Sequence, residues 1–240
     1  MSARQRVELQ PGFVLHTHPW RETSLIVELF SRDHGRMPMV AKGARRPASV
    51  LRGVLMSFQP LLVDWSGGGE VKTLVRAEWQ GGLPLLGGRA LLCGYYLNEL
   101  LIRLLPREDP HQALFGHYGE ALRALSSGGD AQRVLRRFEL ALLQELGYGI
   151  DLSVDADSGE PVKAGESYVF IIERGVLRVE GDPGDLPVLS GRTLLALAAG
   201  DFSSAETLAQ GKVLLRRLIN HYLGGQPLQS RRVFTELMEL

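Results

Sequence analysis

Residues 13–30, FVLHTHPWRETSLIVELF, indicate the fold class of the first part of the chain. Two runs rich in apolar, β-branched and aromatic residues lie on either side of a polar turn, a pattern typical of a β-hairpin. Along residues 22–29 apolar positions alternate with mostly polar ones, and Ile26 is the one exception. Because neighbouring side chains of a strand point to opposite faces, we expect one face of this strand to be largely buried and the other to be mostly wet.

Similar runs, separated by turn-forming residues, continue through the first 80 residues. The expected strands are residues 12–20, 23–31, 35–43, 57–65 and 70–79. Five short strands in so short a segment are typical of a small barrel. The glycines at 67–69 lead from one strand into another, so we expect a plain β-turn there and no phosphate-binding loop.

After about residue 84 the hydrophobic pattern changes to helical spacing. Helices are expected in ALLCGYYLNELLIRLL (90–105) and over residues 111–125 and 130–146, and their short connections predict a helical bundle. Residues 151–187 lose this spacing and are rich in acidic residues. Within them YVFIIERGVLRVEG (168–181) predicts two short strands around a Glu-Arg-Gly turn.

Helical spacing returns at residues 191–199 and 204–223, and a last helix is expected with Ser230 as its N-cap. The order of elements predicts an α+β fold, with a β-barrel followed by a helical bundle that carries a small β-hairpin insertion. The expected domains are the barrel at 1–80, the helical bundle at 81–150, the acidic insertion at 151–187, and C-terminal helices completing the bundle at 188–240.

Composition favours a globular protein of a reducing compartment. The chain has 240 residues, of which 45% are hydrophobic, and a single cysteine, Cys93. One cysteine excludes an intramolecular disulfide framework and a multi-cysteine zinc site, and its apolar surroundings predict a buried thiol. The N-terminus lacks the apolar stretch of a secretion signal, and no run approaches the ~20 apolar residues of a membrane span. We therefore expect a cytoplasmic protein.

The net charge is zero, but the charges are segregated along the chain. Residues 1–80 contain 11 Lys or Arg and 7 Asp or Glu, whereas residues 151–210 contain 4 and 11. Residues 211–240 are basic again, with 5 against 2. Such segregation allows separate faces to bind separate partners, although chance clustering on a solvated surface is the plain alternative.

No motif of an enzyme is present in the sequence. The six histidines form no metal-binding spacing with nearby carboxylates, and His16 and His18 on one strand face are too few for a metal site. The acidic residues between Asp151 and Glu160 lack the 12-residue loop of a calcium site. Nucleophile-elbow, P-loop and dinucleotide-binding patterns are absent. We expect no catalytic residue, no metal and no cofactor.

A basic segment, AKGARRPASVLRG (41–53), covers the end of the third expected strand and the residues just after it. It contains Lys42, Arg45, Arg46 and Arg52, and the fifth expected strand supplies Lys72 and Arg76. Cations on a curved β-surface neutralise phosphates, and exposed aromatic residues can stack on bases. The candidates for stacking are Trp20, Phe58 and Trp65. By the residues alone, a nucleic-acid surface and a basic loop without a ligand are left equally open.

An ordered set of strings gives the chain a resemblance to a known family. In order they are FVLHTHPWRETSLIVELF, VAKGARRP, GEVKTLVRAE, YYLNELL, LRRFELALLQELGYGIDL, SGEPV and YLGGQPLQSRRVF. Each string alone is weak evidence for a family, but their order and separations are specific. Together the strings span nearly the whole chain. The chain resembles the bacterial recombination mediator family RecO.

The resemblance implies an N-terminal OB-fold, a helical bundle and a zinc-type module inserted among the helices. It implies a DNA repair and recombination protein that binds single- and double-stranded DNA and anneals complementary strands. It further implies binding to the C-terminal tail of the single-strand-binding protein and, with RecR, help in loading RecA onto coated gaps. Such a protein is cytoplasmic and nucleoid-associated, and no nucleotide hydrolysis is expected.

The chain departs from the family pattern at three places. Some relatives hold zinc in the module with four cysteines, whereas residues 151–187 contain none, so a degenerate module without metal is expected. His18 stands where many relatives have Arg, and Gln229 where many have Lys. Both departures put in doubt a contribution of these positions to DNA binding.

The resemblance assigns DNA binding to Lys42, Arg45 and Arg46, which match the family's basic motif. Residues on neighbouring strands or in the C-terminal basic pair are added by position: Arg21, Lys72, Arg76, Arg231 and Arg232.

The predicted partner site for the acidic, apolar protein tail lies on helix 130–146. It consists of Arg133, Arg136, Arg137, Phe138 and Leu142. An equally weighted alternative places Phe138 and Leu142 in the bundle core. For the whole protein, the alternatives are a metal-dependent enzyme acting on nucleic acid and a purely structural adaptor.

Overall fold

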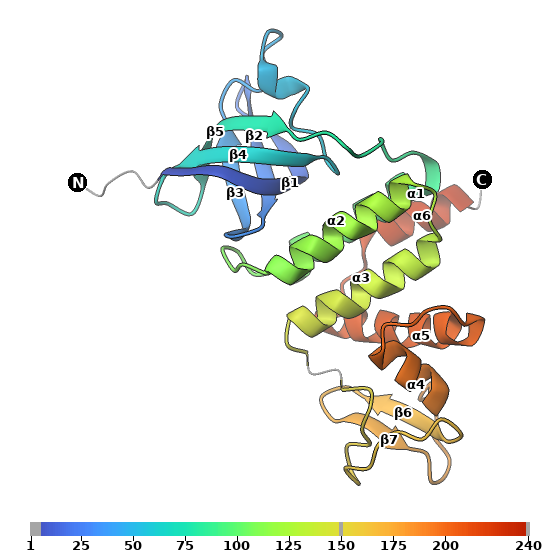
Figure 1. The fold of residues 1–240 in the computed structure, drawn as a ribbon. Coiled ribbons are helices and arrows are strands. Elements are labelled where there is room, and N and C mark those ends of the chain that lie inside the picture. Colours follow the sequence, from blue (N-terminus) through green and yellow to red (C-terminus); the bar gives the residue numbers. More distant parts are fainter. Residues whose placement is uncertain (1–5, 149–150, 239–240) are drawn as a thin grey trace. The chain divides into compact units, whose positions relative to one another are not determined.

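The computed structural model describes residues 6–148 and 151–238, the last five by their backbone alone (Figure 1). The chain divides into two compact units, Met1–Gly129 with Leu228–Leu240, and Asp130–Pro227. The fold class is α+β, as predicted, and the domain boundaries expected at residues 80, 150 and 187 remain predictions.

The first unit contains a closed five-stranded barrel of the OB type (Figure 1). Its strands are β1 Arg6–Trp20, β2 Ser24–Ser31, β3 Gly35–Ala41, β4 Pro60–Ser66 and β5 Lys72–Trp79. They pair in the order β1-β2-β3-β5-β4, and only the β3–β5 contact, at Met39–Lys72 and Val40–Thr73, is parallel. A closed barrel leaves no long unpaired edge. The five predicted strands are confirmed.

The alternation read along β2 correctly identifies the side chains inside the barrel. Val27 and Leu29 point inward and are each 1% exposed, in a core shared with Met37 and Met39 of β3. The expectation of a mostly wet opposite face is wrong for the second half of β2. Phe30 is fully buried, because helix α2 covers it and brings the ring of Phe115 to a centroid distance of 5.4 Å.

Three helices complete the first unit: α1 Gly88–Leu104, α2 Gln112–Ser126 and α6 Gln229–Met238. Two buried hydrogen bonds in series join α1 and α2 to the barrel. The Asn98 amide donates to the carbonyl of Leu15 at 2.8 Å, and the Tyr118 hydroxyl donates to Asn98 Oδ1 at 2.6 Å. Buried polar groups are stable only when they are hydrogen-bonded, so these two bonds fix the orientation of α1 and α2 on the barrel. Cys93 on α1 is buried, as predicted.

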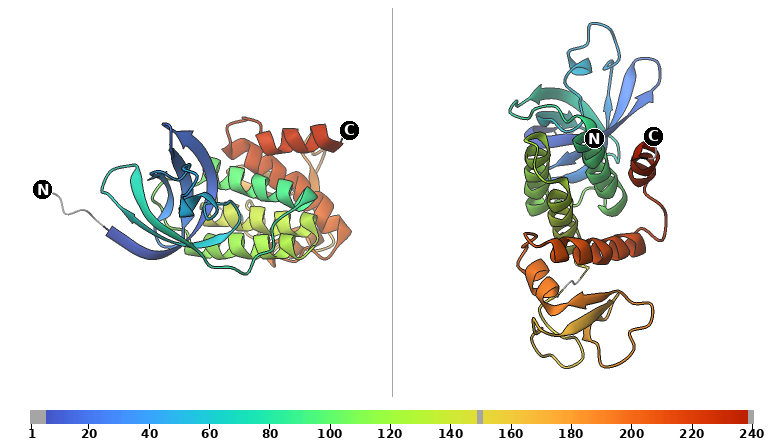
Figure 2. Two further views of the ribbon diagram at one scale, coloured as in Figure 1. Left: turned by 90° about the horizontal axis from the view of Figure 1, so that it is seen from above. Right: turned by 90° about the vertical axis from the view of Figure 1, so that its right-hand side faces the viewer.

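Helix α6 packs against α1 (Figure 2), and its start differs from the prediction. Ser230 is the second residue of the helix and not its N-cap. The Glu99 carboxylate of α1 instead accepts the backbone N–H groups of Gln229 and Ser230, both at 2.8 Å. The N–H groups of a first helical turn have no partner within the helix, and here a distant glutamate supplies one.

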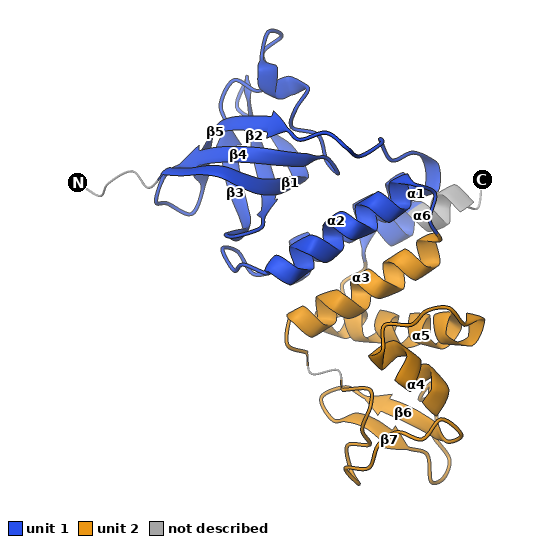
Figure 3. Cartoon of the chain, viewed as in Figure 1, with its two compact units in different colours: residues 1–129, 228–240 blue, residues 130–227 orange. Residues whose placement is uncertain are grey.

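The second unit (Figure 3) combines helices with a small sheet. Its helices are α3 Ala131–Glu145, α4 Gly191–Ala198 and α5 Ala205–Tyr222, and its strands are β6 Ser167–Ile171, β7 Gly175–Arg178 and β8 Val188–Ser190. The β6–β7 hairpin is confirmed. The sheet has the order β7-β6-β8, and the three-residue β8 was not predicted because so short a run carries no readable alternation.

Side-chain caps mark where the helices of the second unit begin. Asp130 accepts the N–H of Gln132 at the start of α3, Ser190 that of Thr193 at α4, and Ser204 that of Glu206 at α5. Such caps stabilise helices. Over the described part of the chain, no helix has the length and apolar character needed to cross a membrane.

Candidate nucleic-acid interface

Four predicted cations lie together at one end of the barrel. Arg21 is in the turn between β1 and β2, and Lys42, Arg45 and Arg46 follow β3. Register brings the two segments together, because Leu25 at the start of β2 pairs with Ala41 at the end of β3, and the Arg45 N–H donates to the carbonyl of Thr23 at 2.8 Å. We call Arg21, Lys42, Arg45 and Arg46 the basic end.

Arg45 ties the loop after β3 to the β1–β2 turn. Its Nη1 donates to the carbonyl oxygens of Arg21 and Glu22 at 3.3 and 3.2 Å. Arg21 has φ of +53°, a left-handed conformation that is uncommon for residues other than glycine. The bonds from Arg45 satisfy the carbonyls of this turn. A guanidinium carries five N–H donors, so Arg45 retains donors for a phosphate.

The cations of the basic end are exposed, and among the described residues none of them is in an ion pair with a carboxylate. The guanidinium carbon of Arg21 lies 5.9 Å from the centroid of the Trp20 ring, within cation–π range. Their charges are therefore available to an anionic ligand. Beyond them, the loop with the short 3-10 helix η1 Val50–Arg52 projects from the barrel (Figure 1).

Lys72 and Arg76 were predicted to extend this surface, but both are already partnered. The Lys72 side chain is 11% exposed, and its ammonium contacts Glu108 Oε1 at 2.9 Å and the Gly69 carbonyl at 2.8 Å. Arg76 is exposed and pairs with Glu78, whose hydrogen bond and charge raise the pKa of Arg76. Both charges are balanced by carboxylates in this structure, and the assignment of Lys72 and Arg76 to DNA binding remains a prediction.

The C-terminal pair lies at the start of α6. Arg231 donates to the Tyr96 hydroxyl at 3.1 Å, and its guanidinium carbon is 5.4 Å from the centroid of that ring. Arg231 thus helps to hold α6 on α1. Arg232 is exposed.

Only one of the three aromatic candidates can stack on a base. Phe58 and Trp65 are buried, at 6% and 2% exposure, and cannot meet a ligand, whereas Trp20 is 43% exposed. Sequence alone does not separate them, because all three lie in or beside strands and only closure of the barrel decides which ring points inward.

The predicted partner site falls on α3 in the second unit. Phe138 and Leu142 are buried in the core, at 2% and 0% exposure, which agrees with the alternative left open from the sequence. Arg136 is also buried and pairs with the fully buried Glu139. Arg133 and Arg137 are exposed, and Arg133 contacts Asp130 at 3.3 Å and the Ser203 carbonyl at 3.4 Å. Of the five predicted residues, only these two present charge to solvent.

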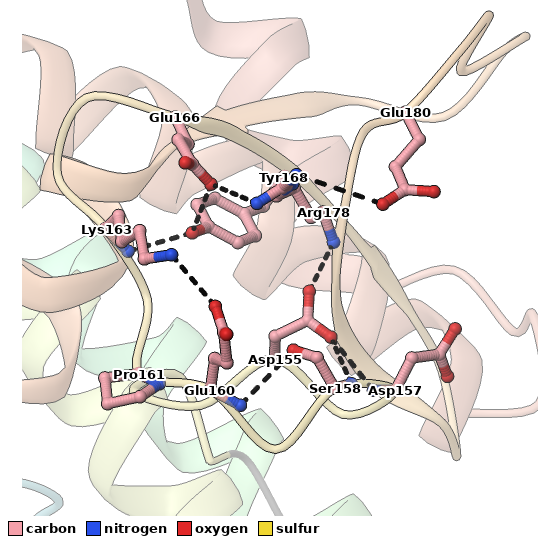
Figure 4. Close-up of a pocket in the computed structure, with 10 residues that line it drawn as sticks. All are labelled: Asp155, Asp157, Ser158, Glu160, Pro161, Lys163, Glu166, Tyr168, Arg178 and Glu180. Atoms are coloured by element: carbon pink, nitrogen blue, oxygen red, sulfur yellow. Dashed lines mark hydrogen bonds and ion pairs between the residues drawn. The ribbon is translucent and has the colours of Figure 1, made fainter.

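The acidic insertion contains a cavity of about 400 Å³ (Figure 4). Its wall carries five acidic and two basic side chains, and Lys163 pairs with Glu160 at 2.9 Å while Arg178 pairs with Glu166 at 3.3 Å. Within the described ranges, no three histidine, cysteine, aspartate or glutamate side chains are placed to hold a metal ion.

One carboxylate organises this module. Asp155 accepts the backbone N–H groups of Asp157 and Ser158 at 3.0 Å and of Arg178 at 2.8 Å (Figure 4). These bonds fasten the acidic loop to β7. They hold the pKa of Asp155 below its usual range, the bond from Ser158 contributing most. The sequence excluded a calcium site for the acidic residues between Asp151 and Glu160 but did not predict this role of Asp155, because its partner Arg178 is 23 positions away.

Comparison with known proteins identifies the family. The model for "Recombination protein O N terminal" matches residues 6–82, and that for "Recombination protein O C terminal" matches residues 87–232. Similar proteins include "DNA repair protein RecO" of Aromatoleum aromaticum and of Azoarcus sp. (strain BH72), each 68% identical over the full length of both chains. The protein of the same description from Dechloromonas aromatica is 53% identical, again over all of both chains. The chain belongs to the RecO family of DNA repair proteins.

Proposed function

We propose that this protein is a non-enzymatic mediator of recombinational repair. It binds single- and double-stranded DNA, anneals complementary strands and, with RecR, helps RecA to load onto gaps coated by the single-strand-binding protein. One observation carries the DNA-binding part: Arg21, Lys42, Arg45 and Arg46 converge at one end of an OB-type barrel without carboxylate partners among the described residues. Membership of the RecO family supports the repair role.

The physical basis is electrostatic. Each phosphate that a lysine or arginine neutralises releases counterions into solution, which favours binding and makes it dependent on salt. Annealing needs no catalytic residue under this proposal, because holding two strands near one another while screening their repulsion raises their effective concentration.

The test is fluorescence anisotropy of labelled oligonucleotides at increasing salt. Replacing Lys42, Arg45 and Arg46 together by alanine removes about three phosphate contacts. The slope of log K against log salt should therefore become shallower by about 2 for single strands. The same variant should slow the annealing of complementary oligonucleotides, measured by energy transfer between end labels.

A matched control removes the same charge from the second unit. Arg192 of α4 and Lys212 and Arg216 of α5 are also exposed, and their joint replacement by alanine should leave the salt slope close to that of the parent. Equal losses in both triple variants would point to a general charge effect. If the variant with Lys42, Arg45 and Arg46 replaced binds DNA as tightly as the parent, the basic end is not the DNA site.

We further propose that exposed arginines of α3 bind the acidic tail of the single-strand-binding protein. Arg133 and Arg137 are the candidates, since Phe138 and Leu142 are buried. A labelled tail peptide should bind the parent, and Arg133→Ala with Arg137→Ala should weaken that binding while the affinity for DNA is kept. The variant with Arg192, Lys212 and Arg216 replaced is the control here as well.

A metal-dependent enzyme is the competing class. Nuclease and ATPase assays, with metal analysis of the purified protein by mass spectrometry, distinguish the two. Turnover that depends on a stoichiometric metal would overturn the non-enzymatic proposal. A structural adaptor would bind no DNA in the anisotropy assay.

A further inference from the structure

The outer face of β1 carries three ring side chains in a row. His16, His18 and Trp20 occupy alternate positions of the strand and all are exposed. A register shift between Val14 and His16 separates them from the buried first part of the hairpin. Alternate residues of a strand project to the same side, and the rings of His16 and His18 are in contact, with centroids 4.2 Å apart. We call these three residues the ring row.

The side chains that neighbour the ring row on the adjacent strands are shorter than its rings. Trp20 pairs with Ser24 of β2, and His18 pairs with Ile26, which in turn pairs with Val40 of β3. These partners are half-buried and shorter than the rings beside them. No bulky exposed side chain of β2 or β3 therefore covers Trp20 on this face.

The ring row leads directly to the basic end. Trp20 is the last residue of β1 and precedes Arg21, which lies over its ring at 5.9 Å. Lys42 follows Ala41, whose partner Leu25 is next to Ser24. Continuing this antiparallel register places Lys42 across the sheet from Trp20. The exposed rings and the cations of the basic end thus form one continuous surface.

We propose that the ring row is a base-stacking track that makes the basic end selective for single-stranded DNA. Trp20 stacks on an unpaired base, His18 and His16 continue the track, and the cations of the basic end hold the adjoining phosphates. This inference rests on the proposed DNA-binding function. Duplex bases present no free ring face, whereas every unpaired base does. The track therefore prefers single strands without reading their sequence.

The test compares single-stranded and duplex DNA of equal length. Trp20→Ala should weaken single-strand binding about tenfold, and duplex binding should change less than twofold. Its salt slope should equal that of the parent, because no charge is removed. Trp79→Ala is the matched control, since Trp79 is 59% exposed on β5 and pairs with Leu61 of β4, whose partner on β1 is Gly12 and not a residue of the ring row. It should leave both affinities unchanged.

Intrinsic fluorescence gives a second readout. Trp65 is buried, so in Trp79→Phe protein the signal of exposed tryptophan comes from Trp20. Adding an oligothymidylate should quench it, as expected when a base stacks on indole. In Trp20→Phe protein, where Trp79 is the exposed tryptophan, the same titration should cause little quenching.

The outcomes separate the two proposals. If the parent binds DNA with a salt slope but Trp20→Ala keeps the parental ratio of single-strand to duplex affinity, the stacking track is wrong and the basic end stands. If the parent shows no salt-dependent affinity for DNA, both are wrong. Circular dichroism of Trp20→Ala should match the parent, because the side chain is exposed.

Discussion

Glu99 on α1 caps the first turn of α6 through Ser230. Its Oε2 accepts the Ser230 backbone N–H at 2.8 Å and the Ser230 hydroxyl at 2.6 Å, across 131 positions of sequence. Burial alone would raise the pKa of Glu99, but the hydrogen bonds from Ser230 and Gln229 and the charge of Arg103 outweigh it, and the pKa lies below its usual value. The ionised carboxylate also suits the positive end of the helix dipole.

Docking of α6 should therefore depend on pH and on Glu99. A carboxyl group whose pKa is lower in the folded state stabilises the fold above its unfolded pKa, and this stabilisation is lost as pH falls through the folded value. We expect α6 amides to lose protection from hydrogen exchange below about pH 4, and in Glu99→Ala at neutral pH, at a cost of about 1 to 2 kcal/mol. Unchanged protection in Glu99→Ala would contradict the cap.

Asp155 should support the acidic module in the same way. Asp155→Ala leaves three backbone N–H groups without their acceptor and should destabilise the second unit by about 2 to 3 kcal/mol. Asp155→Asn keeps one acceptor oxygen and should lose less. Because the pKa of Asp155 is depressed, the parent should lose this stabilisation as pH falls below about 4, and Asp155→Asn should not show that step. Urea unfolding measures these effects.

Arg45 should act through geometry as well as charge. Arg45→Lys keeps the charge but lacks the planar fork that reaches the carbonyls of Arg21 and Glu22. We expect Arg45→Lys to retain the parental salt slope yet to lose affinity for DNA by about threefold, since the β1–β2 turn is less well ordered. The control is Arg46→Lys, whose side chain makes no such bonds among those described. Equal losses of DNA affinity in both variants would show that Arg45 contributes through its charge alone.

Acidification should strengthen DNA binding through His16 of the ring row. Partial burial of the His16 ring lowers its pKa, and the electrostatic effect of the nearby His18 lowers it further. The negative charge of Glu28 offsets this only partly. His16 is therefore neutral at pH 7 in the free protein. Phosphates favour the protonated ring, so affinity for single strands should rise about fivefold as the pH falls well below the usual histidine pKa of about 6.5. His16→Ala should remove that rise in anisotropy titrations.

The sequence by itself determined the five barrel strands, the helices and the inward face of β2, but not the short strand β8. Alternation along residues 22–29 identified Val27 and Leu29 as interior, because the period of a strand is local. Helical spacing located α1 to α5 within a few residues for the same reason. The basic segment at residues 42–46 was also visible, since its charge lies in consecutive positions.

Only the tertiary structure decided which of these charges and rings are available. Lys72 and Glu108 are 36 positions apart, and Glu99 and Ser230 are 131 apart, so no local pattern pairs them. Trp20 and Trp65 are the same residue type and both lie in strands, yet Trp20 is exposed and Trp65 is buried. Their difference arises when the barrel closes and the helices cover part of it, because burial and ion pairing depend on neighbours that chain folding brings from distant positions.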